Sequence, residues 1–190
     1  MSAIYQHLIG ALWLAWVITW SLLARNAKTT LRRESPSSRA AHVVPLIIAA
    51  LLLALATLPG NFLSGRMFPH ALATFWVGAV VLAAGLAFSV WARVHLGRNW
   101  SGAVTIKRDH ELIRHGPYRF VRHPIYTGVL MALIGTAIAR GEWRGLLAVL
   151  IAFAALWRKL VLEERWLSET FSEEYAKYRA EVRALIPFLL

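Results

Sequence analysis

Cysteine is absent from this chain of 190 residues, and charged residues make up only 16% of it. The lack of cysteine excludes a disulfide scaffold, a zinc site built on thiolates and a catalytic cysteine. Soluble domains usually carry about 25% charged residues, so the low charge content points away from an ordinary soluble globule. The length suits one domain, because domains run to roughly 100 to 200 residues, and we treat residues 1–190 as a single unit.

Several local signatures of enzyme sites are also missing. The sequence contains no Gly-x-Gly-x-x-Gly after a strand and no Walker sequence, which excludes a Rossmann dinucleotide site and a P-loop. Ser101 stands outside any Gly-x-Ser-x-Gly frame, so a serine hydrolase has no support. His110, His115 and His123 lie close together, but their spacing matches no zinc pattern, and we predict no metal site.

Long apolar runs are what the chain does have, in keeping with its 58% hydrophobic residues. A helix needs about 20 mostly apolar residues to cross a bilayer. The first run has no basic segment before it and no small-residue cleavage site after it, so it reads as a retained span and not as a signal peptide. We predict an all-α integral membrane bundle of about five transmembrane helices. The predicted spans are residues 3–24, 43–58, 71–94, 125–139 and 145–162.

Turn and proline signals refine these limits. Pro45 suits the first turn of the second helix, and Pro124 suits the first turn of the fourth, where a missing N–H costs little. The charged turn at residues 140–144 separates the fourth and fifth runs by only a few positions. That short connection predicts an antiparallel helical hairpin.

The distribution of basic residues indicates an orientation. A formal net charge of +11 would suggest nucleic acid binding in a soluble protein. Here, however, 18 of the 21 Lys and Arg residues fall in residues 25–42, 93–124 and 158–190, and only three fall in the opposite loops. Because short cytoplasmic loops are enriched in Lys and Arg, we predict an N-terminus outside, a C-terminus in the cytoplasm and no nucleic acid partner.

Polar chemistry is concentrated in two cytoplasmic blocks, residues 95–124 and 158–190, and the centres of the apolar runs carry no charged residue. This pattern favours a site at the cytoplasmic membrane face over a pore. The basic, serine-rich loop at residues 25–42 is predicted to be a solvated or headgroup-contacting linker without a chemical role.

In the first block, Pro124 makes His123 a candidate N-cap of the fourth helix. A helix N-terminus attracts a carboxylate or phosphate, and Tyr126 could add a hydroxyl or an aromatic face there. The alternative is that the arginines, the histidine and the tyrosine of this block are only interfacial anchors.

In the second block, Lys159 and Glu163 are four residues apart on one helix face, with Arg158 beside them. The alternative is that Arg158 and Lys159 only extend their charged ends to the membrane surface. Apolar residues then recur at helical spacing and predict an amphipathic C-terminal helix. These residues are Leu160, Leu167, Phe171, Tyr175 and Tyr178.

Two motifs resemble the isoprenylcysteine carboxyl methyltransferase (ICMT) family. The first is Gly-Pro-Tyr-x-x-x-Arg-His-Pro-x-Tyr-x-Gly at residues 116–128. The second begins with Glu163-Glu164 and continues through Tyr178, and an Ile-Pro-Phe triplet closes the match at residues 186–188. Eukaryotic members of that family carry a glycine where this chain has Ser172.

The resemblance implies a compact five-span membrane enzyme that uses S-adenosyl-L-methionine and lacks a Rossmann domain. It implies carboxyl O-methylation of an isoprenylcysteine-like or other lipophilic acceptor that enters from the lipid bilayer. The implied catalytic residues are Arg158, Lys159 and Glu163, with either cation in contact with the substrate. The implied cofactor pocket is cytoplasmic and contains His110, Glu111, Leu112, Ile113, Tyr118, His123, Pro124, Ile125, Tyr126 and Glu163.

Three other functions share parts of this pattern. A phospholipid N-methyltransferase would carry similar Arg-His-Pro and Glu-Glu elements, although an amine acceptor needs a general base. A sterol-reductase-like enzyme would bind a nicotinamide cofactor in a similar C-terminal region. A non-enzymatic membrane protein would bind neither cofactor. The sequence favours no particular oligomeric state.

Overall fold

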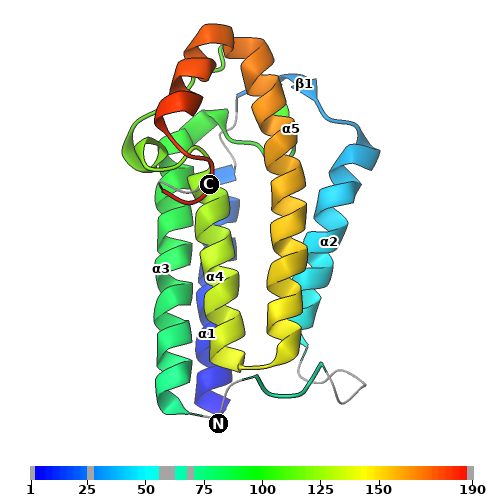
Figure 1. Ribbon diagram of the computed structural model, residues 1–190, viewed down its shortest axis with the longest axis vertical. Helices are drawn as coiled ribbons and strands as arrows, with labels where there is room; N and C mark the ends of the chain where they lie inside the picture. Colours follow the sequence, from blue (N-terminus) through cyan, green and yellow to red (C-terminus); the bar gives the residue numbers. More distant parts are fainter. Residues whose placement is uncertain (1–2, 25–27, 56–62, 68–70, 188–190) are drawn as a thin grey trace.

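Five long helices stand side by side in the computed structural model, which describes residues 3–24, 28–55, 63–67 and 71–187 (Figure 1). The predicted all-α bundle is confirmed. The helices are α1 (Ala3–Leu23), α2 (Pro36–Ala54), α3 (Leu72–Leu96), α4 (Pro124–Arg140) and α5 (Trp143–Glu181). Two short 3₁₀ turns, η2 (Gly97–Asn99) and η3 (Gly116–Arg119), and the strands β1 (Thr30–Arg33) and β2 (Thr105–Lys107) lie between them.

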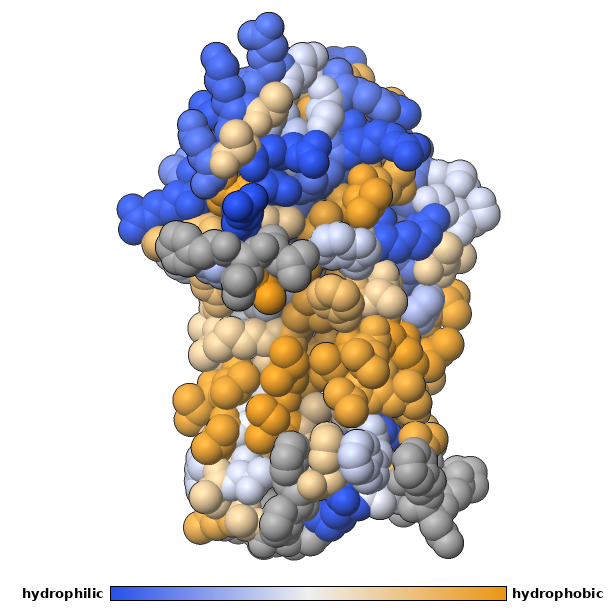
Figure 2. Space-filling model, in the orientation of Figure 1, coloured by the Kyte–Doolittle hydropathy of each residue, from blue (hydrophilic) through white to orange (hydrophobic). Residues whose placement is uncertain are grey.

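The bundle has the surface of a membrane protein. Of the described helices, α2, α3 and α5 are long and apolar enough to cross a membrane. Helix α4 and the part His7–Leu23 of α1 are shorter apolar helices. Figure 2 shows an apolar band across the middle of one face of the molecule and a strongly hydrophilic region at one end. Large apolar side chains such as Leu14, Val80 and Leu150 are more than half exposed, as expected where the surrounding solvent is lipid.

The start of the second helix was predicted wrongly. We expected it at residue 43, but α2 begins at Pro36, because Ser35 caps it by accepting a hydrogen bond from the Ser38 backbone N–H at 3.2 Å. Pro45 therefore lies inside the helix and not in its first turn. The helix ends at Ala54, and the last predicted positions of this span, residues 56–58, lie outside the described residues.

The loop at residues 25–42 is also more than a solvated linker. Its strand β1 pairs antiparallel with β2, about 70 residues further along the chain. Beside this sheet, the buried Glu34 donates its backbone N–H to the Val104 carbonyl at 3.0 Å and accepts the Val104 N–H on Oε1 at 2.8 Å. The basic loop thus fixes the segment that precedes β2.

Helices α3 and α4 pack backbone against backbone. A Cβ atom added to Gly85 would lie 2.5 Å from the Ala132 nitrogen and 2.6 Å from the Gly128 oxygen. Gly78 and Gly135 meet in the same way two turns further along the pair. Small residues at such a contact let membrane helices approach closely, so these four glycines set the distance between α3 and α4.

The hairpin predicted at residues 140–144 is present. Gly141 closes α4 in the left-handed conformation, with φ at 66°, and α5 begins two residues later. The fifth span and the predicted amphipathic tail form one long element, interrupted where Ser172 has φ of 41° and ψ of −110°. Beyond it the chain returns to α4, where the backbone N–H of His123 donates to the Ala184 carbonyl at 3.0 Å.

Candidate functional site

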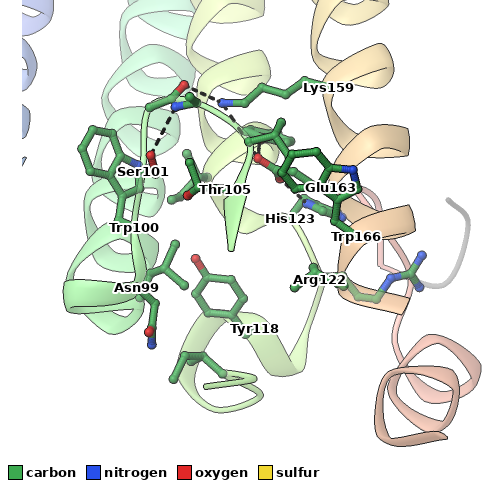
Figure 3. A pocket seen from close by; sticks show the side chains of 18 of the residues that line it. Asn99, Trp100, Ser101, Thr105, Tyr118, Arg122, His123, Lys159, Glu163 and Trp166 are labelled. Carbon is green, nitrogen blue, oxygen red and sulfur yellow. Dashed lines mark hydrogen bonds and ion pairs between the residues drawn. The ribbon is translucent and has the colours of Figure 1, made fainter. Parts of the chain in front are cut away.

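A cavity of about 370 Å³ lies where the helices meet the polar end of the bundle (Figure 3). Its walls come from all five helices, from η3 and from the segment at residues 99–113. It lies within the size range of about 300 to 1,000 Å³ that is usual for small-molecule sites. Most of the predicted site residues line it, namely His110, Glu111, Leu112, Ile113, Tyr118, His123, Ile125, Tyr126, Lys159 and Glu163. Pro124 and Arg158 are not among the lining residues.

Glu163 is the polar centre of this cavity. The Tyr126 hydroxyl donates to Glu163 Oε1 at 2.6 Å, and His123 Nδ1 lies 3.6 Å from Glu163 Oε2. The rings of His123 and Tyr126 stack with centroids 5.4 Å apart, because both project from the start of α4. A carboxylate, an imidazole and a phenol therefore share one corner of the cavity.

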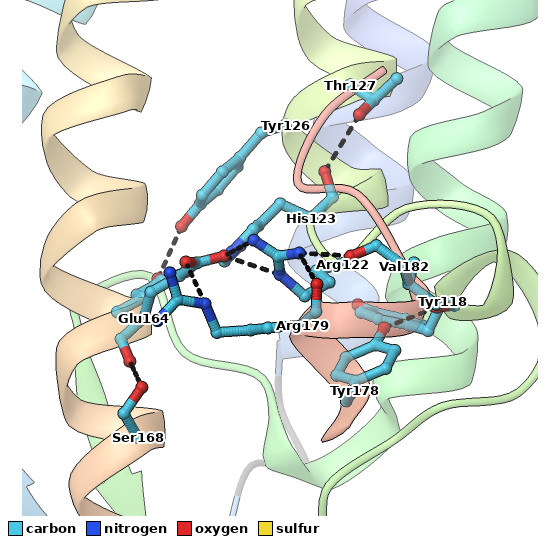
Figure 4. A network of polar contacts seen from close by, with 11 residues as sticks. Tyr118, Arg122, His123, Tyr126, Thr127, Glu164, Ser168, Tyr178, Arg179 and Val182 are labelled. Carbon is cyan, nitrogen blue, oxygen red and sulfur yellow. Dashed lines mark hydrogen bonds and ion pairs between the residues drawn. The ribbon is translucent and has the colours of Figure 1, made fainter. Parts of the chain in front are cut away.

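Glu164 faces a second polar network on the other side of His123 (Figure 4). Arg122 donates from Nε and Nη2 to Glu164 Oε1 at 2.8 and 2.6 Å, and Arg179 Nε lies 3.4 Å from Oε2. Arg122 also donates to the Val182 carbonyl, so the network ties the returning C-terminal segment to α4 and α5.

The two acids favour the charged form of His123. Burial alone would lower the pKa of His123, but hydrogen bonds to Glu163 and Glu164 outweigh it, and the pKa is raised above 6.5. The imidazolium form is thus stabilised by the two carboxylates on either side of it. The N-cap role predicted for this residue is only partly present, since its side chain makes no cap hydrogen bond.

His110 has the opposite character. Burial, followed by the nearby charges of Lys28 and Lys107, lowers its pKa below 6.5. Its Nδ1 accepts a hydrogen bond of 3.3 Å from the Lys107 backbone N–H, which suits a neutral imidazole. Burial, followed by the charge of Glu163, raises the pKa of Tyr118, so this phenol stays protonated. The two histidines of the cavity therefore have pKa values shifted in opposite directions.

The two adjacent cations predicted for the site point to different places. Lys159 lines the cavity, donates to the Gly102 carbonyl at 3.2 Å and lies 3.9 Å from Glu163 Oε1. Arg158 instead donates to the Ser38 carbonyl at 3.0 Å and contacts His42 on α2. Of the two cations, it is Lys159 that faces the enclosed space.

Some residues that line the cavity were not predicted from the sequence. Trp16 and Trp20 of α1 and Leu46 of α2 also line the cavity, although in the sequence they looked like ordinary membrane-facing residues. Glu34 fixes the segment at residues 103–104, which lines the cavity. The sequence did contain a hint of this role, since Glu34 is the one acidic residue between residues 25 and 42. Among the described residues, no group of three or more His, Asp or Glu side chains could hold a metal ion.

The fold and the site define a membrane-embedded helical protein whose cavity is lined by both charged and apolar side chains. Residues 73–174 match the family model of the phospholipid methyltransferases (PEMT). A probable protein-S-isoprenylcysteine O-methyltransferase from rice is 32% identical over 133 residues, which cover 65% of this chain and 68% of the rice protein. A steroid 5-alpha-reductase from tomato is 30% identical over 116 residues, which cover 60% of this chain and 42% of that protein.

A solved structure has the same fold. The eukaryotic intramembrane Ras methyltransferase ICMT (isoprenylcysteine carboxyl methyltransferase) matches with a TM-score of 0.51 at 24% identity. The match covers 84% of this chain and 55% of that one, so the chain spans about half of that structure. The chain belongs to the phospholipid methyltransferase family, and its relatives include isoprenylcysteine O-methyltransferases. The resemblance seen in the motifs is confirmed.

Proposed function

We propose that this protein is an S-adenosylmethionine-dependent methyltransferase that esterifies the carboxylate of an isoprenylcysteine-like, lipophilic acceptor. Its relatives of the isoprenylcysteine O-methyltransferase group support the reaction type. The observation that carries the proposal is the composition of the cavity, whose lining includes the charged Lys159 and Glu163 together with the apolar Trp16, Trp20 and Leu46. An acceptor with a charged head and an apolar tail matches both kinds of lining residue.

The polar lining of the cavity has the right groups for the methyl donor. The donor carries a carboxylate, an ammonium, ribose hydroxyls, an adenine and a sulfonium, and when bound it would supply an activated methyl group. Glu163 would accept hydrogen bonds from the ammonium or the ribose, and Tyr118 and Tyr126 offer faces to the cationic or aromatic parts. Asn99 Oδ1 is buried beside the cavity without a hydrogen-bond partner among the described residues, so it can accept one from a ligand.

The first turn of α4 would serve the carboxylate of the methyl donor. The first backbone N–H groups of an α-helix have no acceptor within the helix, so they are free to bind an anion. Ile125 and Tyr126 line the cavity at this turn. The segment at residues 110–113 would close the same pocket, since all four residues line it. Pro124 would act only by starting the helix.

The acceptor needs little acid–base assistance. A carboxylate with a pKa near 4 is already ionised at neutral pH, so it is a nucleophile without loss of a proton. The protein has to hold it roughly 3 to 3.5 Å from the methyl carbon and exclude water. Lys159 would attract this carboxylate as a point charge, and the tryptophans of α1 would shield the site from the bilayer side.

The proposed orientation places the cavity in the cytoplasm, where the methyl donor is synthesised. It rests on the 18 of 21 basic residues in segments at the polar end. A lipophilic acceptor would then reach the site from the inner leaflet of the lipid bilayer and not through solution.

The experiment is a methyl-transfer assay on the purified full chain with isotope-labelled S-adenosylmethionine. A prenylcysteine analogue should yield a base-labile methyl ester that releases labelled methanol. Glu163→Ala and His123→Ala should abolish donor binding, whereas Arg39→Gln, at an exposed position on α2, should leave it unchanged. Unchanged donor binding in both site variants would overturn the site assignment.

The family model supports a second candidate, methylation of a phospholipid amine. Phosphatidylethanolamine in the same assay would yield a base-stable N-methyl product. A base-stable product in place of the ester would reject carboxyl methylation in favour of this candidate. A third arm with a nicotinamide cofactor tests the reductase chemistry of the tomato relative, and reduction of a sterol enone would reject methyl transfer altogether.

A further inference from the structure

A second cavity of about 540 Å³ lies between α5 and the returning C-terminal segment. We call it the arginine groove. Trp157 and Val161 line its apolar side, and Arg165, Arg179 and Arg183 line its polar side. Arg122 is the one described residue that lines both this groove and the cavity of the proposed methyl transfer. The groove is therefore a separate site.

The groove has a large excess of positive charge. Four arginines line it, and Glu164 is the one acid among its described lining residues. Arg122 and Arg179 already pair with Glu164. Arg165 and Arg183 are exposed, and within the described part of the chain neither has an ion-pair partner. The guanidinium groups of Arg165 and Arg183 thus line the groove without a carboxylate of the described residues to neutralise them.

An apolar stripe on α5 leads into the groove. Its exposed side chains are spaced by three or four residues, which places them on one helix face. The stripe covers roughly 22 Å at 1.5 Å per residue, and Arg165 follows one turn later. Its members are Leu146, Leu150, Phe153, Trp157 and Val161. Trp157 and Val161, at the end of this stripe, are also lining residues of the groove.

We propose that the arginine groove binds an anionic phospholipid, whose acyl chain lies along this stripe and whose phosphate sits among Arg165, Arg179 and Arg183. A guanidinium fork binds phosphate oxygens in pairs, which favours arginine for this role. An anionic glycerol headgroup adds no positive charge, whereas a choline headgroup would bring a cation toward the arginines. The groove therefore selects anionic over zwitterionic lipid.

The test measures lipid preference by native mass spectrometry of the full chain released from mixed micelles. The probes are dioleoyl phosphatidylglycerol and dioleoyl phosphatidylcholine at equal concentration. Each basic residue near an anionic lipid surface contributes about a fivefold factor in affinity. We expect Arg165→Gln combined with Arg183→Gln to lower the preference for phosphatidylglycerol about 25-fold. A preference that stays unchanged in this double variant overturns the proposal.

Matched variants separate the groove from general charge. Arg39→Gln combined with Arg108→Gln removes the same charge from exposed positions outside the groove and should keep the preference. Arg165→Lys combined with Arg183→Lys keeps the charge and should retain most of it. Equal loss in the control pair would overturn a specific site. Displacement of the lipid by millimolar glycerol 3-phosphate would also overturn it, because the stripe must hold an acyl chain.

Discussion

The hydroxyl of Tyr126 donates a hydrogen bond of 2.6 Å to Glu163 Oε1 and so joins the first turn of α4 to α5 across the main cavity. Hydrogen bonds to a charged group contribute about 1.5 to 3 kcal/mol. In Tyr126→Phe the carboxylate loses this partner and is free to turn toward solvent. We expect the dissociation constant for S-adenosylmethionine to rise about tenfold or more, measured by calorimetry. An unchanged constant would show that Glu163 is positioned by other contacts.

Lys159 and Arg158 should differ in their effect on the acceptor. Lys159→Met removes the cation that faces the cavity, and we expect the acceptor KM to rise about tenfold or more while kcat changes less. Arg158→Met is the matched control, since Arg158 contacts Ser38 and His42 instead. Steady-state kinetics with a prenylcysteine analogue check both. A larger KM effect in Arg158→Met would reverse the assignment.

The two histidines of the site should produce opposite pH dependences of stability. Because the folded pKa of His123 is raised, its contribution is complete below about pH 6.5 and is lost as pH rises through the raised value. Because the folded pKa of His110 is lowered, the unfolded chain takes up a proton first, and stability falls as pH drops below 6.5. Melting temperatures of the detergent-solubilised protein between pH 5 and 9 measure both effects.

The variants separate the two contributions. His123→Gln should flatten the alkaline side of the stability profile, and His110→Gln should flatten the acidic side. The same flattening in both variants, or the reverse assignment, would contradict the pKa shifts described above.

The contact between α3 and α4 should not tolerate a methyl group. In Gly85→Ala the new Cβ would meet backbone atoms at 2.5 and 2.6 Å, so the helices must separate. Overpacking of this kind costs about 1 to 3 kcal/mol. Gly10→Ala is the control, because nothing lies within 4 Å of the Cβ it would add. Melting temperature in detergent should fall in the first variant and stay level or rise in the second.

Ser172 holds a backbone conformation that suits glycine, with φ of 41° and ψ of −110°. Such strain costs about 1 to 3 kcal/mol, so we expect Ser172→Gly to stabilise the protein and raise its melting temperature by several degrees. Ser168→Gly is the control, since Ser168 lies in the regular part of α5. A glycine there should destabilise the protein by about 0.5 to 1 kcal/mol. A fall in both variants would contradict the prediction.

The sequence predicted the helices well where apolar runs are bounded by charge or proline, as at Pro124 and at the turn of residues 140–144. It failed at α2, whose first two turns are polar and start from the Ser35 cap. The strands β1 and β2 were also missed, because three or four residues carry no periodic signal and pair across a long separation. The positive φ of Ser172 could not be predicted either, because a serine within an apparently helical stretch gives no signal of a left-handed backbone.

Some residues of the site could be predicted from the sequence and others could not. His123, Tyr126 and Glu163 were predicted, because they belong to contiguous motifs, although their roles in methyl transfer remain predictions. Trp16 and Leu46 were missed, because in an apolar helix nothing in the sequence separates a lipid-facing side chain from one that faces a cavity. The choice between Arg158 and Lys159 depends on the rotation of α5, which is set by its packing against α2.

The glycine contact between α3 and α4 also has a consequence for the cavity. Since the two backbones touch directly, no layer of side chains separates the helices there, and α4 carries His123 and Tyr126 at its start. The facing side chains come from α5, where Glu163 accepts a hydrogen bond from Tyr126 and Glu164 accepts one from Arg122. Two adjacent carboxylates of one helix thus connect α5 to the start of the glycine-packed helix.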